Sequence, residues 1–131
     1  MKLLLDTHAL IWYVQGSSNL STKAIQLIDA VNNEIFVSII SFYEIAIKLK
    51  IGKLKLSKSL KEYFKDTVLH NIFVLPVTEK YLSEYGNVPL IPTHKDPFDR
   101  LIIATAIIEK MSIITVDEQF LNYKELIETV W

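Results

Sequence analysis

No cysteine occurs among the 131 residues of the chain. This absence excludes disulfides, thiolate zinc sites, iron–sulfur clusters and a cysteine nucleophile. Glycine and proline are scarce, at three and four residues, and they are too scattered to form a linker between domains. Half of the residues are hydrophobic, which is typical of a packed globule. We therefore expect one domain spanning residues 1–131.

Long apolar runs are missing as well. No stretch approaches the ~20 apolar residues that a membrane-spanning helix needs. The apolar run at the N-terminus ends at Asp6, which is too early for a signal peptide. We therefore expect a cytoplasmic protein with no membrane attachment.

Arginine is nearly absent, because Arg100 is the single one and the net charge is −1. Bidentate recognition of bases relies mainly on arginine, so binding to nucleic acid would depend on backbone charge and shape. Positive charge gathers between positions 48 and 65, where seven lysines are opposed by Glu62 alone. Such a run is either a solvated face or a patch that contacts phosphates. The candidates for contact with an RNA backbone are Lys48, Lys50, Lys53 and Lys55.

The apolar pattern predicts strands alternating with helices. Strands are predicted at residues 2–5, 34–38, 72–75, 112–116 and 127–131. Helices are predicted at residues 7–14, 22–30, 42–50, from Ser57 or Ser59 to about 68, 79–85 and 97–110, with a helical turn at 118–121. Ser41, Thr78 and Asp96 are the expected N-caps of three of these helices. Because the strands are continuous apolar runs, we expect an α/β fold, a three-layer α/β/α sandwich with a central parallel sheet.

Acidic residues occupy positions where such a sheet builds its sites. Asp6 and Asp117 directly follow predicted strands, and ligands of open parallel sheets bind outside the carboxyl ends of the strands. Glu44 lies in a predicted helix that is apolar on nearly every face, where an uncompensated carboxylate is unfavourable. Asp96 and Asp99 precede a second helix of this kind.

Each acid also has a purely structural explanation. Asp6, Asp96 and Asp117 could each cap the helix or turn that follows. Asp99 could be the inner partner of a capping box, or it could pair with Lys95 or Arg100.

Glu44 could pair with Lys48, one helical turn further along the chain. Taken together, however, these acids have few cations nearby, and clustered carboxylates raise one another's pKa. A hard divalent cation such as Mg²⁺ or Mn²⁺ relieves that repulsion through oxygen ligands. His8 and His94 are therefore expected to make hydrogen bonds or contact substrate rather than to bind the metal.

Four ordered segments resemble a known family. They read LLLDTHALIW at 3–12, SFYEIAIK at 41–48 with GKL at 52–54, HKDPFDRLIIATA at 94–106, and ITVD at 114–117. Together they are similar to the PIN-domain ribonucleases, and most similar to VapC-type toxins of bacterial toxin–antitoxin pairs. The resemblance covers essentially the whole chain, so it implies a single PIN domain at residues 1–131.

The resemblance also implies an activity and a site. It implies Mg²⁺- or Mn²⁺-dependent hydrolysis of RNA phosphodiester bonds, a small antitoxin partner and a homodimer. Asp6, Glu44, Asp99 and Asp117 match the family's acidic quartet, as catalytic residues and metal ligands. Asp96 and Thr115 match additional positions whose roles are less settled, and Thr115 is expected to support an acid or contact substrate.

Three other interpretations are weighed. A haloacid-dehalogenase phosphatase requires a second acid two positions after Asp6, where this chain has His8. A receiver domain, which is regulatory, requires a paired acid after its first strand and a lysine after its fifth, and neither is found. A PIN fold that binds RNA or a partner without cleavage is the third, and an intact acidic quartet argues against it.

Overall fold

The computed structural model describes all residues 1–131. Two α-helices separate each of the first three strands from the next, and a 3₁₀ helix separates the last two strands. In chain order the elements are β1 (Lys2–Leu5), α1 (Thr7–Gln15), α2 (Thr22–Asp29), β2 (Glu34–Ser38), α3 (Ile39–Lys50), α4 (Leu60–Leu69), β3 (Ile72–Leu75), α5 (Glu79–Tyr85), α6 (Pro97–Glu109), β4 (Ser112–Ile114), the 3₁₀ helix η1 (Glu118–Tyr123) and β5 (Thr129–Val130). None of the helices has the length and apolar character needed to cross a membrane.

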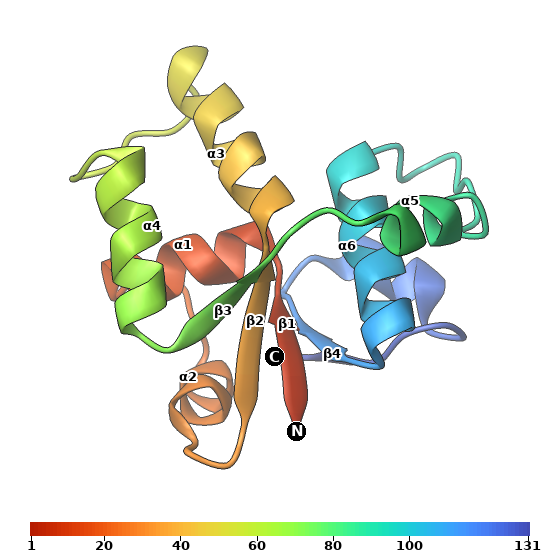
Figure 1. Ribbon diagram of the computed structural model, residues 1–131, viewed down its shortest axis with the longest axis horizontal. Coiled ribbons are helices and arrows are strands. Elements are labelled where there is room, and N and C mark those ends of the chain that lie inside the picture. The colour runs from red at the N-terminus through yellow and green to blue at the C-terminus, as the bar shows by residue number, and fades with distance from the viewer.

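All five strands form one parallel sheet in the order β3-β2-β1-β4-β5. Figure 1 shows the sheet between two helical layers, with α1, α2 and α4 on one side and α5 and α6 on the other. The predicted three-layer α/β/α sandwich is confirmed. The strand order differs from the 2-1-3-4-5 order of receiver domains, so the fold excludes that alternative.

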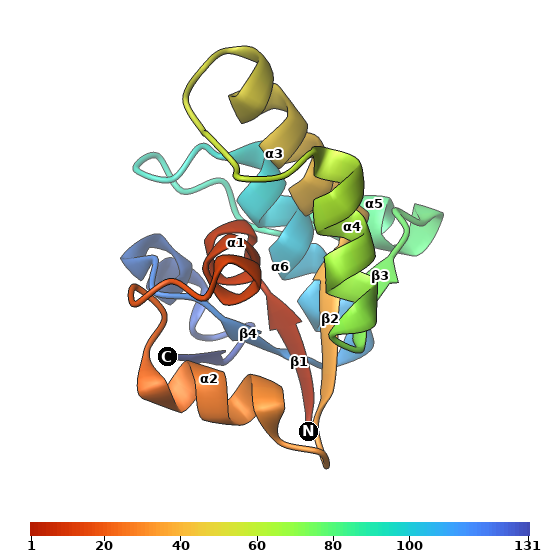
Figure 2. The same ribbon diagram turned by 90° about the vertical axis from the view of Figure 1, so that its left-hand side faces the viewer.

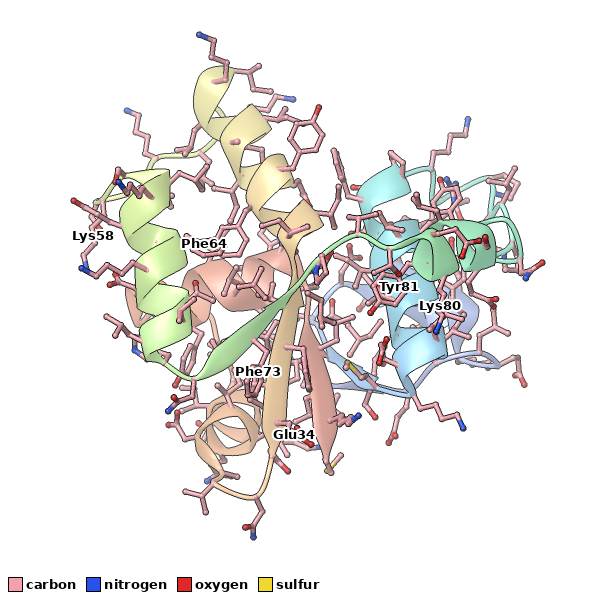
Figure 3. All side chains as sticks on the ribbon, viewed as in Figure 1. Glu34, Lys58, Phe64, Phe73, Lys80 and Tyr81 are labelled. Atoms are coloured by element: carbon pink, nitrogen blue, oxygen red, sulfur yellow. The ribbon has the colours of Figure 1, made fainter.

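Alternate residues of β1 supply two cores, because successive side chains of a strand point to opposite faces. Leu3 and Leu5 join a cluster with side chains of α1, α2 and α3, whereas Leu4 joins a cluster with α6 and η1. Helix α4 closes the first cluster from outside. Its Phe64 points inward (Figure 3), and its ring packs at a tilt of 56° against Phe42 of α3, with centroids 5.0 Å apart.

The parallel strands end at one edge of the sheet, where α3 and α6 meet. Figures 1 and 2 show α3 extending beyond the ends of β1 and β2, with the first turn of α6 at the same end of the molecule. The two helices are in contact. Both predicted apolar helices therefore bring their acids to the edge where β1 and β4 end.

Several predicted boundaries were wrong. Helix α3 begins at Ile39, and its N-cap is Ser38, whose hydroxyl accepts from the amide of Ile40; Ser41 is fully buried instead. Thr78 precedes α5 but makes no capping bond. Helix α3 begins earlier than predicted because Ser38, the last residue of β2, also caps the helix. No loop residues separate the two elements, so the apolar pattern runs on without marking the boundary.

The last two strands are shorter than predicted. β4 ends at Ile114, and β5 is only Thr129–Val130. The chain turns away after Thr115, whose amide still donates to the carbonyl of Val130. Asp117 therefore lies in the connection to η1 rather than directly at the strand end.

Candidate active site

Asp6 lies at the end of β1 and caps α1. Its Oδ1 accepts from the amide of Ala9 (2.7 Å), and its Oδ2 accepts from the hydroxyl of Thr115 (2.5 Å). The side chain is 4% exposed. Burial raises the pKa of the Asp6 carboxyl, because a low-dielectric environment disfavours the charged form; the two hydrogen bonds oppose this effect. No lysine or arginine forms an ion pair with Asp6.

Thr115 connects Asp6 to a second acid. Its hydroxyl donates to Asp6 and accepts from the amide of Asp117 at 3.0 Å. Asp117 is exposed and starts η1, because its Oδ1 accepts from the amide of Gln119. The charge of Asp117 raises the pKa of Asp6 further. The hydroxyl that follows β4 thus connects the Asp6 carboxylate to the backbone of Asp117 at the same edge.

Glu44 reaches this edge from α3 and is 7% exposed. Its Oε1 accepts from the hydroxyl of Thr7 (2.8 Å), which also lies 3.0 Å from Ser41 Oγ. Its Oε2 forms an ion pair with Lys48 at 2.9 Å. The pairing one turn along the helix, one of the two interpretations above, is therefore present. Because Thr7 follows Asp6 directly, it links Glu44 to the end of β1.

Asp99, in the first turn of α6, is a second acid of the edge whose pKa is raised. Burial raises its pKa to about 7, and the charges of Asp96 and Glu44 act in the same direction. Its Oδ2 is hydrogen-bonded to Nε2 of His94 at 2.8 Å, which opposes the rise. Neither Lys95 nor Arg100 forms the ion pair that the sequence suggested.

His94 was expected to make hydrogen bonds, and it does, but the sequence did not indicate Asp99 as its partner. His94 is 4% exposed, and its ring contacts Tyr123 with centroids 5.5 Å apart. Arg100 donates to the carbonyl oxygen of His94 at 2.7 Å, so the single arginine of the chain holds a loop rather than an acid. The spacing of His94 and Asp99 gave no signal for this pair, because a loop brings them together.

Asp96 acts as the N-cap of α6. Its Oδ1 accepts from the amides of Phe98 (2.8 Å) and Asp99 (3.3 Å), and Pro97 takes the first helical position. The capping interpretation holds for this residue. Its charge nevertheless affects the site, because it disfavours ionisation of Asp99.

The edge therefore carries two pairs of acids, Asp6 with Asp117 and Glu44 with Asp99. Each carboxylate has a protein partner of its own, and no three acidic or histidine side chains are arranged to hold a metal ion. The chemistry of the donor set nonetheless suits a hard cation, because the acids at this edge offer carboxylate oxygens and some of them are buried. Joint coordination requires some of these side chains to turn away from their present partners.

The four candidate lysines fall into two groups. Lys48 is bound to Glu44, with its side chain 29% exposed. The other three lie at the end of α3 and in the loop after it, where they are exposed and form no ion pair: Lys50, Lys53 and Lys55.

The protein is thus an α/β protein with a parallel sheet. Buried acids lie where its strands end, and they form an acidic site of the kind that suits hard cations. The chain belongs to the PIN domain family, whose profile matches residues 3–126. No curated protein matches it in sequence.

Solved structures share the fold. VapBC2 from Rickettsia felis, bound to a DNA fragment from its promoter, matches with a TM-score of 0.71 and 23% identity over 98% of each chain. A toxin–antitoxin complex from Klebsiella pneumoniae matches with a TM-score of 0.65 and 19% identity, over 98% of this chain and 96% of that one. FitAcB from Neisseria gonorrhoeae matches with a TM-score of 0.65 and 18% identity, over 98% and 96%.

Proposed function

We propose that this protein is a Mg²⁺- or Mn²⁺-dependent endoribonuclease and the toxin of a toxin–antitoxin pair. The observation that carries the proposal is the pair of buried carboxylates, Asp6 and Asp99, whose pKa values are both raised at the carboxyl edge of the sheet. Acids in such a place do not favour stability, since ionising a buried carboxyl is unfavourable, and perturbed pKa values of this kind are typical of functional sites. Membership of the PIN domain family supports the same conclusion.

The proposed reaction is hydrolysis of an RNA phosphodiester bond. The residues proposed to hold the ion are Asp6, Asp99 and Asp117, with Glu44 contributing directly or through water. A bound divalent ion supplies a water of lowered pKa and stabilises negative charge on phosphate oxygens. In the protein, Thr115 orients Asp6 through its hydroxyl.

Two side chains must change partner for the acids to act together. Glu44 would leave Lys48, and Asp99 would share its oxygen with His94 or release it. Because Asp99 has a pKa of about 7, it is partly protonated near neutral pH, and ion binding would displace that proton. His94, already in hydrogen-bond contact, is placed to receive it.

The RNA strand is proposed to lie over the edge toward the end of α3. Lys50, Lys53 and Lys55 are exposed and form no ion pairs, so their charges are free to contact phosphates. Lys48 would join them once it is released from Glu44.

A small antitoxin protein and a second copy of this chain are the proposed partners. The antitoxin partner is supported by a solved structure of the same fold that is described as a toxin–antitoxin complex. The second copy rests on the resemblance in sequence alone. A PIN fold that binds RNA without cleavage is the second candidate. The observation favouring it is that each acid of the edge is engaged by its own protein partner.

A cleavage assay separates the two. Purified protein is incubated with end-labelled single-stranded RNA in Mg²⁺, in Mn²⁺ and in EDTA, beside an Asp6→Asn variant purified in the same way. We expect fragments with either metal and none in EDTA or with the variant. If the protein binds RNA but produces no fragments, the non-cleaving candidate is supported. If the variant cleaves RNA as well as the parent does, the activity comes from a contaminating nuclease.

A further inference from the structure

A hollow beside the acidic edge is not used by the proposed chemistry. It measures about 220 Å³, below the roughly 300–1,000 Å³ of sites that hold drug-sized ligands. A group the size of one flat ring system fits such a space. Its lining comes from the β4–η1 connection, η1 and β5: Thr115, Val116, Asp117, Glu118, Leu121, Thr129, Val130 and Trp131.

One wall of the hollow is aromatic. Trp131 stands edge-on to Trp12 of α1, with ring centroids 5.9 Å apart, and Trp12 lies 5.7 Å from the ring of His8. His8 is exposed and both tryptophans are half-buried. The three rings form a row, here called the aromatic row, that runs from the start of α1 to the hollow.

The hollow is continuous with the candidate active site. Thr115, whose hydroxyl donates to Asp6, belongs to its lining, as does Asp117. The other end of the aromatic row begins with His8, two positions after Asp6. A group seated in the hollow would therefore lie next to the acids.

Charge limits what the hollow can bind. Asp117 and Glu118 line it and no basic residue does, so it repels a phosphate. Carboxylates only accept hydrogen bonds, so they suit a ligand whose edge donates them. The Glu118 carboxylate has no ion pair and no hydrogen bond within the protein, which leaves both of its oxygens available.

We propose that the hollow binds a nucleobase of the RNA strand, next to the phosphate that is cut. This proposal rests on the proposed function, because it assumes that the acidic edge receives RNA. The base stacks on Trp131, and its Watson–Crick edge donates to Glu118. Guanine is the base favoured, because its N1–H and N2–H donors lie side by side and match the two oxygens of one carboxylate, whereas the other bases lack such a pair.

Tryptophan fluorescence tests this directly, since the only two tryptophans of the chain are both in the aromatic row. The protein in EDTA is titrated with four 2′-O-methyl trinucleotides that differ only in the central base and cannot be cleaved. We expect quenching, with the guanine trinucleotide binding about 10-fold or more tighter than the uracil one, since a bidentate hydrogen-bonded base contact discriminates by an amount of this size.

Matched variants assign the contacts. Glu118→Gln keeps the shape but replaces an acceptor oxygen with a donor, so it should remove most of the guanine preference. Trp131→Leu keeps an apolar wall without a ring, so all four trinucleotides should bind more weakly, with Trp12 as the remaining reporter. Glu125→Gln is the control, because Glu125 is exposed but lies outside the hollow, and it should bind like the parent.

The outcomes separate this proposal from the nuclease proposal. Quenching with guanine preference, in a protein that cuts no RNA with Mg²⁺ or Mn²⁺, would support the base site and overturn the nuclease. Metal-dependent cleavage with no quenching would overturn the base site alone. Equal affinity for the four bases, or a guanine preference that survives Glu118→Gln, would also overturn it.

Discussion

Thr115 and Asp6 are separated by 109 positions, yet the hydroxyl of Thr115 donates to Asp6 Oδ2 and accepts from the amide of Asp117. One small side chain therefore connects the ends of two neighbouring strands. The orientation of Asp6 depends on this contact, because its other oxygen is already engaged by the amide of Ala9.

Replacing Thr115 tests that dependence. Thr115→Val keeps the shape and removes the hydroxyl, which leaves the Asp117 amide without its acceptor at a cost of about 1–3 kcal/mol of stability. We expect Mn²⁺ affinity, measured by calorimetry, to fall roughly 10- to 100-fold, as for other groups that orient a metal ligand. Thr115→Ser should restore it, and equal affinity in the valine and serine variants would contradict an orienting role.

Asp6→Asn and Asp99→Asn should each reduce RNA cleavage at least about 100-fold, because several kcal/mol of transition-state stabilisation would be lost with a metal ligand. Both variants should fold, since asparagine can still cap α1 and neither change leaves a buried charge. Circular dichroism and a fragment assay give the two readouts. Cleavage at the parental rate by a folded variant would remove that residue from the site.

The raised pKa of Asp99 makes stability depend on pH. The folded pKa of about 7 lies above the ordinary value of 3.8, so the folded state holds the proton more tightly than the unfolded state. Stability from this group is then greatest at low pH and falls as pH rises from about 4 to about 7.

Urea denaturation in EDTA across that range should show this fall for the parent and a smaller one for Asp99→Asn. Parallel curves for the two proteins would show that Asp99 does not titrate there.

The exposed lysines after α3 should set the salt dependence of RNA binding. Substituting Lys50, Lys53 and Lys55 with glutamine should weaken RNA binding. It should also lower the slope of log affinity against log salt concentration by roughly 2, because each phosphate contact of a single strand contributes about 0.7 to that slope. Fluorescence anisotropy with an uncleavable RNA measures both quantities.

A control for this charge removal uses exposed lysines outside the patch, one of them on α5 (Figure 3). The control variant carries Lys23→Gln, Lys80→Gln and Lys124→Gln. Similar slopes for the two triple variants would mean that the effect comes from net charge alone.

Ile103 of α6 is fully buried against the face of the sheet that Leu4 supplies. Ile103→Ala should lower the free energy of unfolding by about 2–5 kcal/mol, and Ile103→Val by about 0.5–1.5 kcal/mol. Both can be measured by urea denaturation. A similar small loss for the two variants would mean that α6 shifts to fill the cavity left by the alanine. The first turn of α6, which carries Asp99, would then not be rigidly held.

The elements of the fold were predictable because their signals are local. The apolar run before Asp6 predicted β1, and Asp96-Pro97 predicted the start of α6, since both depend on neighbouring residues. The end of β4 was not predictable in this way. Thr115 and Val116 continue the apolar pattern, but the chain turns there to reach η1.

The partners of the acids were less predictable. The pairing of Glu44 with Lys48 was foreseen as one alternative, because both lie on one helix. The contact of Asp99 with His94 was not, because it depends on a loop held by Arg100.

By itself, the sequence determined the alternation of strands and helices, the PIN family and the placement of acids after β1 and in the apolar helices. Residue pattern is enough for these features, because hydrophobic periodicity and capping act over a few positions. Only the tertiary structure decided how deeply Asp6 and Asp99 are buried, which hydroxyl or histidine meets each of them, and that Trp12 stands beside Trp131. Desolvation and side-chain contact arise from segments far apart in the chain, so no local pattern records them.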